Sequence, residues 1–235
     1  MLIGGLQKLT LIDYPGKIAC TVFVVGCNFR CHFCHNPELV DPAKFKLSEI
    51  IEEKKFFDFL KSRKGLLEGV CITGGEPTIH PDLPQFIKEI KALGFLVKLD
   101  TNGTSPKMIE ALVSGGIVDY IAMDIKTSLQ NNFYEKVVGV AVDFENIKKS
   151  IEIIMQSDLE FEFRTTVVPG LHTEENILDI TKYIHGAKRY YLQQFRPSKK
   201  IFDADFREIK PYPIEFLKEL RDKIKDNFDV CEVRE

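Results

Sequence analysis

The chain has 235 residues, and its 32 Lys and Arg side chains against 35 Asp and Glu give a formal net charge of −3 at pH 7. Hydrophobic residues make up 44% of the sequence and charged residues 29%, which excludes an intrinsically disordered chain. The balanced charge argues against a nucleic-acid-binding protein that works through a dominant basic field. A chain of this length can fold around its own core without disulfide bonds.

The cysteines and the apolar stretches indicate the compartment. Three of the six cysteines, Cys27, Cys31 and Cys34, fall within eight positions, which does not favour a disulfide framework in a chain of this size. The apolar stretch 18–25 is not followed by a small-residue cleavage site, so no signal peptide is expected. No stretch reaches the roughly 18 consecutive apolar residues of a membrane helix. We therefore expect a cytoplasmic protein with reduced thiols and no membrane or nucleic-acid partner.

Short apolar runs alternate along the chain with segments of helical period. The expected strands are, in order, 18–25, 70–73, 95–101, 120–124, 159–168 and 189–195. The expected helices carry their apolar residues over 47–60, 83–90, 106–114, 147–154, 177–184 (with Thr173 at the start of this helix) and 217–224. This alternation predicts an α/β fold with a mainly parallel sheet. We interpret it as a partial (β/α)6 TIM-like barrel, with residues 1–235 forming a single domain.

The expected strands become polar or rich in glycine at their carboxyl ends. The clearest cases are Gly26-Cys27, 73–76, 100–103, 124–126 and Gln193-Gln194. In a parallel barrel these ends meet on one face, where such folds place their chemistry. In an open doubly wound sheet they would line a crevice instead, and periodicity alone does not separate the two architectures.

The three clustered cysteines form a Cys-x3-Cys-x2-Cys motif in a loop, residues 26–36, that follows the first expected strand. Three thiolates are one fewer than the four ligands of a structural zinc site. On a four-iron cubane, three thiolates leave one iron without a protein ligand, which suits a centre that binds a substrate. His32 or His35 could complete a zinc site instead, and this alternative stays open.

The motif continues as His35-Asn36-Pro37-Glu38, and in this form it resembles the cluster loop of radical S-adenosylmethionine (SAM) enzymes. More narrowly, it resembles that of the activating enzymes of glycyl-radical enzymes. Further stretches are similar in the same order, and they are 13–16, 73–77, 100–103, 124–126, Arg164 and 167–170. The segments 5–17 and 194–197 most resemble the activating proteins of anaerobic ribonucleoside-triphosphate reductases. The resemblance extends from about residue 5 to residue 196.

The resemblance implies a role for each matching residue. Cys27, Cys31 and Cys34 would hold one [4Fe–4S] cluster, and SAM would chelate the fourth iron. The SAM contacts implied are Phe33, Cys34 and His35 at the adenine, Gly74 and Gly75 at the methionine amino group, Asp124 and Lys126 at ribose and carboxylate, and Arg164 as a fixed positive charge. A monovalent-cation site beside SAM would involve Asp100, Thr101 and Asp124.

The implied activity is reductive cleavage of SAM to methionine and a 5′-deoxyadenosyl radical, which abstracts hydrogen from a glycine of a partner glycyl-radical enzyme. The implied electron donor is a flavodoxin or a ferredoxin-type protein. No second cysteine-rich insertion lies between Asn36 and Gly74, so one cluster is expected. Where a relative has a histidine in the last barrel strand, this chain has Gln194 or Arg196, so no role is transferred there. The alternatives are a radical SAM enzyme acting on a small molecule or RNA, an iron–sulfur electron-transfer module and a structural zinc protein.

Overall fold

The order of the strands in the sheet follows their order in the chain. In the computed structural model, which describes residues 1–130 and 133–235, eight strands form one sheet. β1 (Ile3–Thr10) lies antiparallel to β2 (Ala19–Val24). Each following strand is parallel to the one before it, and these strands are β3 (Gly69–Gly74), β4 (Leu96–Thr101), β5 (Tyr120–Asp124), β6 (Glu160–Val167), β7 (Arg189–Gln194) and β8 (Val230–Arg234).

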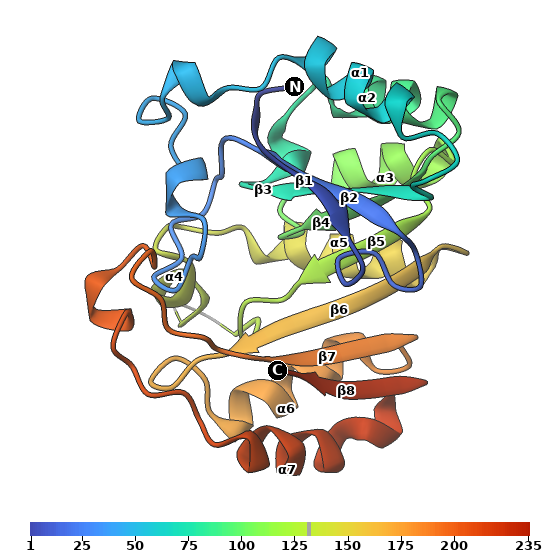
Figure 1. The fold of residues 1–235 in the computed structure, drawn as a ribbon. Coiled ribbons are helices and arrows are strands. Elements are labelled where there is room, and N and C mark those ends of the chain that lie inside the picture. Colours follow the sequence, from blue (N-terminus) through green and yellow to red (C-terminus); the bar gives the residue numbers. More distant parts are fainter. Residues whose placement is uncertain (131–132) are drawn as a thin grey trace.

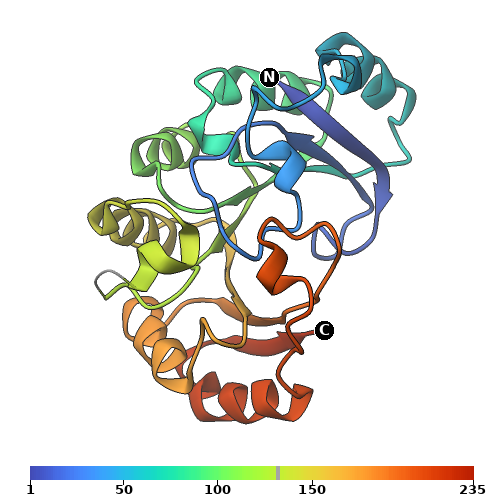
Figure 2. The same cartoon turned by 90° about the vertical axis from the view of Figure 1, so that its left-hand side faces the viewer.

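Most of the helices line the outer side of the curved sheet (Figures 1 and 2). The helices are α1 (Glu53–Ser62), α2 (Leu83–Ala92), α3 (Pro106–Ser114), α4 (Phe133–Val138), α5 (Phe144–Met155), α6 (Glu174–Ile184) and α7 (Ile214–Ile224). Short 3-10 turns lie at Pro37–Leu39, Leu47–Glu49, Pro77–Ile79, Ala204–Phe206 and Lys225–Asn227. In the described parts of the chain, no helix is both long enough and apolar enough to span a bilayer.

The two faces of the barrel strands differ in chemistry because successive side chains of a strand point to opposite sides. On β4, Val97 and Leu99 belong to the main hydrophobic core, which lies between sheet and helices. Their neighbours Lys98 and Asp100 form an ion pair on the inner face of the sheet. The space enclosed by the curved sheet, here called the lumen, is therefore lined by charged groups.

Tyrosine side chains occupy the lumen at the amino-terminal ends of the strands. Tyr14, from the turn between β1 and β2, packs with Ala19, Tyr120 and Ala122 in a small second core. The rings of Tyr14 and Tyr120 lie 6.0 Å apart. This end of the lumen is filled by side chains, so the cavities of the barrel lie toward the carboxyl ends and the open side of the sheet.

The predicted α/β class with a mainly parallel sheet is confirmed, and all six expected strands are present. Two further strands, β1 and β8, and the short helix α4 were not predicted. The expected helix over 47–60 begins only at Glu53, because Leu47 lies in a separate 3-10 turn where its side chain is exposed. Thr173 caps α6 through a capping box with Asn176, as its position before the apolar repeat indicated.

Candidate cluster and cofactor site

The cysteine loop, residues 26–36, crosses the carboxyl ends of the first barrel strands and is fixed by backbone hydrogen bonds. The Cys27 N–H donates to the Val40 carbonyl at 3.0 Å. The Arg30 N–H donates to the Val138 carbonyl, at the end of α4, at 2.8 Å. The loop therefore has a defined backbone path between two other segments of the chain.

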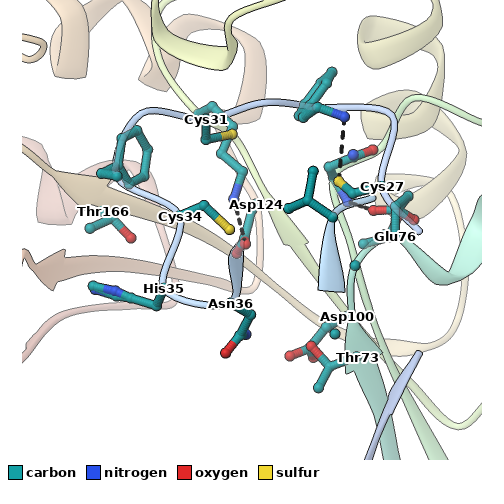
Figure 3. A pocket seen from close by; sticks show the side chains of 18 of the residues that line it. Cys27, Cys31, Cys34, His35, Asn36, Thr73, Glu76, Asp100, Asp124 and Thr166 are labelled. Carbon is teal, nitrogen blue, oxygen red and sulfur yellow. Dashed lines mark hydrogen bonds and ion pairs between the residues drawn. The ribbon is translucent and has the colours of Figure 1, made fainter. Parts of the chain in front are cut away.

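The three thiols of the motif line one cavity of about 220 Å³ beneath this loop. Figure 3 shows the sulfur atoms of Cys27, Cys31 and Cys34 facing the same space. Burial raises the pKa of the Cys27 thiol to about 11 and that of the Cys31 thiol to about 12. Such thiols stay protonated at neutral pH until a metal deprotonates them by coordination.

The donor set fits an iron–sulfur cubane better than a single zinc ion. Within residues 1–130 and 133–235, no three His, Cys, Asp or Glu side chains stand close enough together to hold one metal ion. Each thiolate of a cubane binds a different iron, so its cysteines stand further apart than the ligands of one ion. The His32 imidazole is taken up by Asp203 at 2.8 Å, and the His35 ring packs 6.1 Å from that of Phe195. Three thiols remain as candidate ligands of one cavity, the number that a cubane with one open iron requires.

A partly buried charge network lines the same cavity as the thiols. The Lys126 ammonium lies 2.9 Å from one oxygen of Asp124, and Arg164 Nε donates to the other oxygen at 2.7 Å. Arg164 also reaches Asp100 at 3.3 Å. Burial alone would raise the pKa of the Asp124 carboxyl, but the charges of Arg164 and Lys126 outweigh it and hold that pKa well below its usual range. The cavity thus presents fixed charges of both signs, as a zwitterionic ligand requires.

Gly74 and Gly75 are required by the neighbouring backbone. A Cβ at Gly74, whose φ is +119°, would lie 2.4 Å from the Val24 nitrogen. A Cβ at Gly75 would lie 2.0 Å from the carbonyl oxygen of Gly26, the residue before Cys27. The glycines therefore let the end of β3 approach the start of the cysteine loop, a reason that the sequence analysis did not give.

Glu76 is a structural element of the site that sequence reasoning missed. Its side chain is 1% exposed and accepts hydrogen bonds from Thr101 Oγ1 at 2.8 Å and from the Asn102 N–H at 2.7 Å. Its own N–H donates to the Gly26 carbonyl at 2.7 Å. Glu76 thus joins the loops after β3 and β4 to the cysteine loop. The signal available in the sequence was a carboxylate directly after the two glycines.

Every predicted site residue lines the cavity of the thiols. They are Cys27, Cys31, Phe33, Cys34, His35, Gly74, Gly75, Asp100, Thr101, Asp124, Lys126 and Arg164. The cation site stays a prediction, because Asp100 and Asp124 already pair with Arg164 and Thr101 donates to Glu76. Neither Gln194 nor Arg196 is among the lining residues, since the Gln194 amide donates to the Tyr212 carbonyl and Arg196 is exposed.

His172, to which the sequence analysis assigned no role, contacts both the Lys126 backbone and the Phe33 ring of the site. The Val168 N–H donates to His172 Nδ1 at 3.0 Å, and Nε2 lies 2.6 Å from the Lys126 carbonyl oxygen. Nδ1 is therefore an acceptor, and the neutral ring donates from Nε2. The ring also packs edge-on against Phe33, with centroids 6.3 Å apart. His172 thus holds the backbone of Lys126 and one residue of the cysteine loop.

The buried, neutral His172 predicts a pH dependence of stability. Burial lowers the pKa of its imidazole. Below about pH 6.5 the unfolded chain binds a proton there that the folded chain does not, so the free energy of unfolding rises with pH up to that value. We expect His172→Gln to flatten the slope of unfolding free energy against pH between about pH 5 and pH 7, measured by urea denaturation of the apoprotein. The control is His185→Gln, at an exposed position. Equal slopes in all three proteins would contradict the assignment.

Comparison with known proteins gives the family. Residues 21–184 match the radical SAM superfamily. The chain is 36% identical over 241 residues to MJ1227 of Methanocaldococcus jannaschii, described as a glycyl-radical enzyme activating enzyme, covering 99% of this chain and 95% of that one. It is 28% identical over 243 residues to the pyruvate formate-lyase-activating enzyme of Clostridium pasteurianum, covering 95% and 97%.

Solved structures share the fold. That of Streptococcus suis SuiB superposes with a TM-score of 0.67 at 15% identity, covering 90% of this chain and 48% of that one. The chain thus spans about half the length of this structural neighbour, and the likeness concerns the fold alone. With the match over 21–184 and the relative that is similar along its whole length, the chain belongs to the radical SAM superfamily, whose members use a [4Fe–4S] cluster and SAM.

Proposed function

We propose that this protein installs a glycyl radical on a partner enzyme, with a [4Fe–4S] cluster held by Cys27, Cys31 and Cys34. The observation that carries the proposal is that these thiols and the Asp124–Lys126–Arg164 network line a single cavity. The similarity to activating enzymes along nearly the whole chain supports the class of reaction. All six cysteines are free thiols, which agrees with a location in the reducing cytoplasm.

The chain's own residues bind, orient and shield the reactants. When bound, the cluster and SAM supply a 5′-deoxyadenosyl radical, and the bond-breaking chemistry belongs to them. Asp124 and Lys126 would contact the ribose and carboxylate of SAM and Arg164 would supply a fixed positive charge, while Phe33 and His35 would cover its adenine. The three charged groups are held before the ligand binds by the hydrogen bonds described above, so little reorganisation is required when it does.

A second opening supports a polypeptide as the substrate. A cavity of about 510 Å³ on the open side of the barrel is lined by Ile12, Asp13 and Arg234 and shares Asp100 and Arg164 with the cavity of the thiols. Its rim carries exposed apolar side chains on the connection from β1 to β2, and Ile12 is 84% exposed. Exposed apolar side chains that gather at the rim of a cavity are typical of a protein–protein contact. A loop of a partner bound there would reach the wall of the cofactor cavity.

We further propose that the partner is an anaerobic ribonucleoside-triphosphate reductase and that a flavodoxin or ferredoxin-type protein donates the electron. The resemblance of segments 5–17 and 194–197 to activating proteins of such reductases supports this choice of partner. The test is anaerobic incubation of the reconstituted, reduced protein with SAM and a candidate reductase, followed by electron paramagnetic resonance. The doublet of a glycyl radical on the reductase is the expected result. SAM cleavage without a doublet on any candidate would favour a small molecule or an RNA as substrate.

Ile12→Glu is expected to separate partner binding from SAM cleavage. A charge on the rim opposes burial against a partner, so we expect the yield of glycyl radical at limiting protein to fall about tenfold, the equivalent of about 1.4 kcal/mol. The release of 5′-deoxyadenosine without partner should not change. The control is Leu47→Glu, which places the same charge at another exposed apolar position, 82% exposed. An equal loss in both variants would remove Ile12 from the docking surface.

A further inference from the structure

Residues 201–207, here called the strap, run beside the cysteine loop although 165 or more positions separate the two in the sequence (201 − 36). In Figures 1 and 2 this segment, drawn in orange-red, lies next to the blue loop at the carboxyl ends of the strands. The Phe202 N–H donates to the Cys34 carbonyl at 3.1 Å, and the Asp203 N–H donates to the His32 carbonyl at 3.0 Å. The strap thus binds the backbone of one proposed cluster ligand and of the residue that follows another.

Side chains of the strap also fix the His32 ring. Asp203 Oδ2 lies 2.8 Å from His32 Nδ1. The ring of Phe206 stacks on the imidazole, with centroids 5.5 Å apart and planes at 18°. The second oxygen of Asp203 accepts the Asp205 N–H at 3.0 Å and so begins the 3-10 turn that carries Phe206. One carboxylate therefore positions both the histidine and the ring that covers it.

The strap is anchored in the body of the protein independently of the loop it binds. Ile201, its first residue, is fully buried in the main hydrophobic core. Arg207 Nε, at the other end, donates to the Ile201 carbonyl at 2.9 Å and closes the segment on itself. On the opposite side of the loop, Arg30 is held by the end of α4. The cysteine loop thus lies between the strap, whose first residue is held in the core, and the end of α4.

We infer that Asp203 and Phe206 are positioning residues for the iron–sulfur cluster, acting through His32 on the Cys31–Cys34 segment. The inference rests on the proposed assignment of the cysteines as cluster ligands. Groups that orient metal ligands from the next shell tune both the affinity and the redox behaviour of a centre. The strap supplies this orientation through its contacts with the His32 ring and with the carbonyl of Cys34.

The test compares iron release and potential in reconstituted Asp203→Ala with the unaltered protein. We expect Asp203→Ala to lose iron to a chelator about tenfold faster under anaerobic conditions. Its cluster should also show a shifted midpoint potential in a titration monitored by electron paramagnetic resonance. Asp203→Asn keeps one oxygen for the Asp205 N–H and presents an amide N–H that His32 Nδ1 accepts in the tautomer protonated at Nε2, so it should restore slow release. Phe206→Leu keeps apolar bulk but loses the ring stack, and it should give an intermediate rate.

The matched control is Asp205→Ala, which removes an exposed carboxylate from the same turn. Apoprotein melting temperatures that agree between variants would assign faster release to the cluster and not to unfolding. Release from Asp203→Ala at the rate of Asp205→Ala, with an unchanged potential, would overturn the inference. Asp203→Asn losing iron as fast as Asp203→Ala would also overturn it. Cys31→Ala, measured in parallel, separates the two assignments, because a full cluster in that variant would refute the ligands themselves.

Discussion

Replacement of Cys31 by alanine is expected to abolish both the cluster and the cleavage of SAM. Cys31 is buried in the middle of the loop, and its loss leaves two thiolates for a cubane that needs three from this protein. After anaerobic reconstitution, iron and sulfide should fall to the background of the apoprotein. The release of 5′-deoxyadenosine should fall by more than about 100-fold, beyond the range for loss of a group that only orients a metal ligand.

Cys231→Ala is the control for this result. Cys231 is also a buried thiol, but it lies on β8 and does not line the cavity of the other three. Its replacement should leave iron, sulfide and 5′-deoxyadenosine release unchanged. Full retention of iron and sulfide in Cys31→Ala would refute the ligand assignment. Stoichiometric zinc and no iron in the unaltered protein would instead show that the cysteines form a structural zinc site.

Gly75→Ala is expected to cause the second large loss, because the added methyl group meets backbone. Its Cβ would lie 2.0 Å from the Gly26 oxygen, and a peptide group cannot move aside as a flexible side chain can. We expect the free energy of unfolding of the apoprotein to fall by about 3 kcal/mol, the upper range for an overpacked site. Retention of the cluster should fall with it, since the displaced carbonyl precedes Cys27.

Gly5→Ala is the matched control, because a Cβ at Gly5 would make ordinary contacts of 3.4 Å or more with the Phe23 side chain. The comparison also separates two reasons for a glycine at position 75. The resemblance suggested that the missing side chain lets the methionine amino group approach the backbone. The structure shows that it lets the Gly26 carbonyl lie against Gly75. Unchanged stability and cluster content with weakened SAM binding would favour the first reason over the second.

The sequence predicted those elements of the fold whose apolar residues form a continuous run or recur at a regular spacing. Strands such as β3 and β5 are apolar over most of their length, so their positions were evident. β1 was not, because Gly4-Gly5 and Gln7-Lys8 give it little of the character of a buried strand. It forms because its partner β2 offers an edge, which is a tertiary property. The helix before β3 begins later than expected, because Leu47 lies in a separate 3-10 turn with its side chain exposed and so does not extend the apolar face of α1.

The site was predictable where residue spacing carried the signal. Three cysteines at fixed intervals and polar residues at successive strand ends indicated where the site lies, and the resemblance to radical SAM enzymes supplied the individual residues. Glu76 and His172 could not be assigned in this way, because their roles depend on partners such as Asn102 and Lys126 that the fold brings to them. The contact between the strap and the cysteine loop could not be predicted for the same reason, since nothing in the sequence of the strap indicates its partner.

Arg164 stands in the wall between the two cavities of the barrel. Toward the thiols it binds Asp124, and toward the open side it lies 3.8 Å from Glu162, which Arg234 holds at 2.7 Å. A ligand that draws this guanidinium toward one cavity changes the charge balance of the other. Such a coupling free energy is reciprocal: a partner that tightens the binding of SAM must itself be bound more tightly, by the same factor, once SAM is in place. The enzyme would then favour its protein substrate only when it is already loaded.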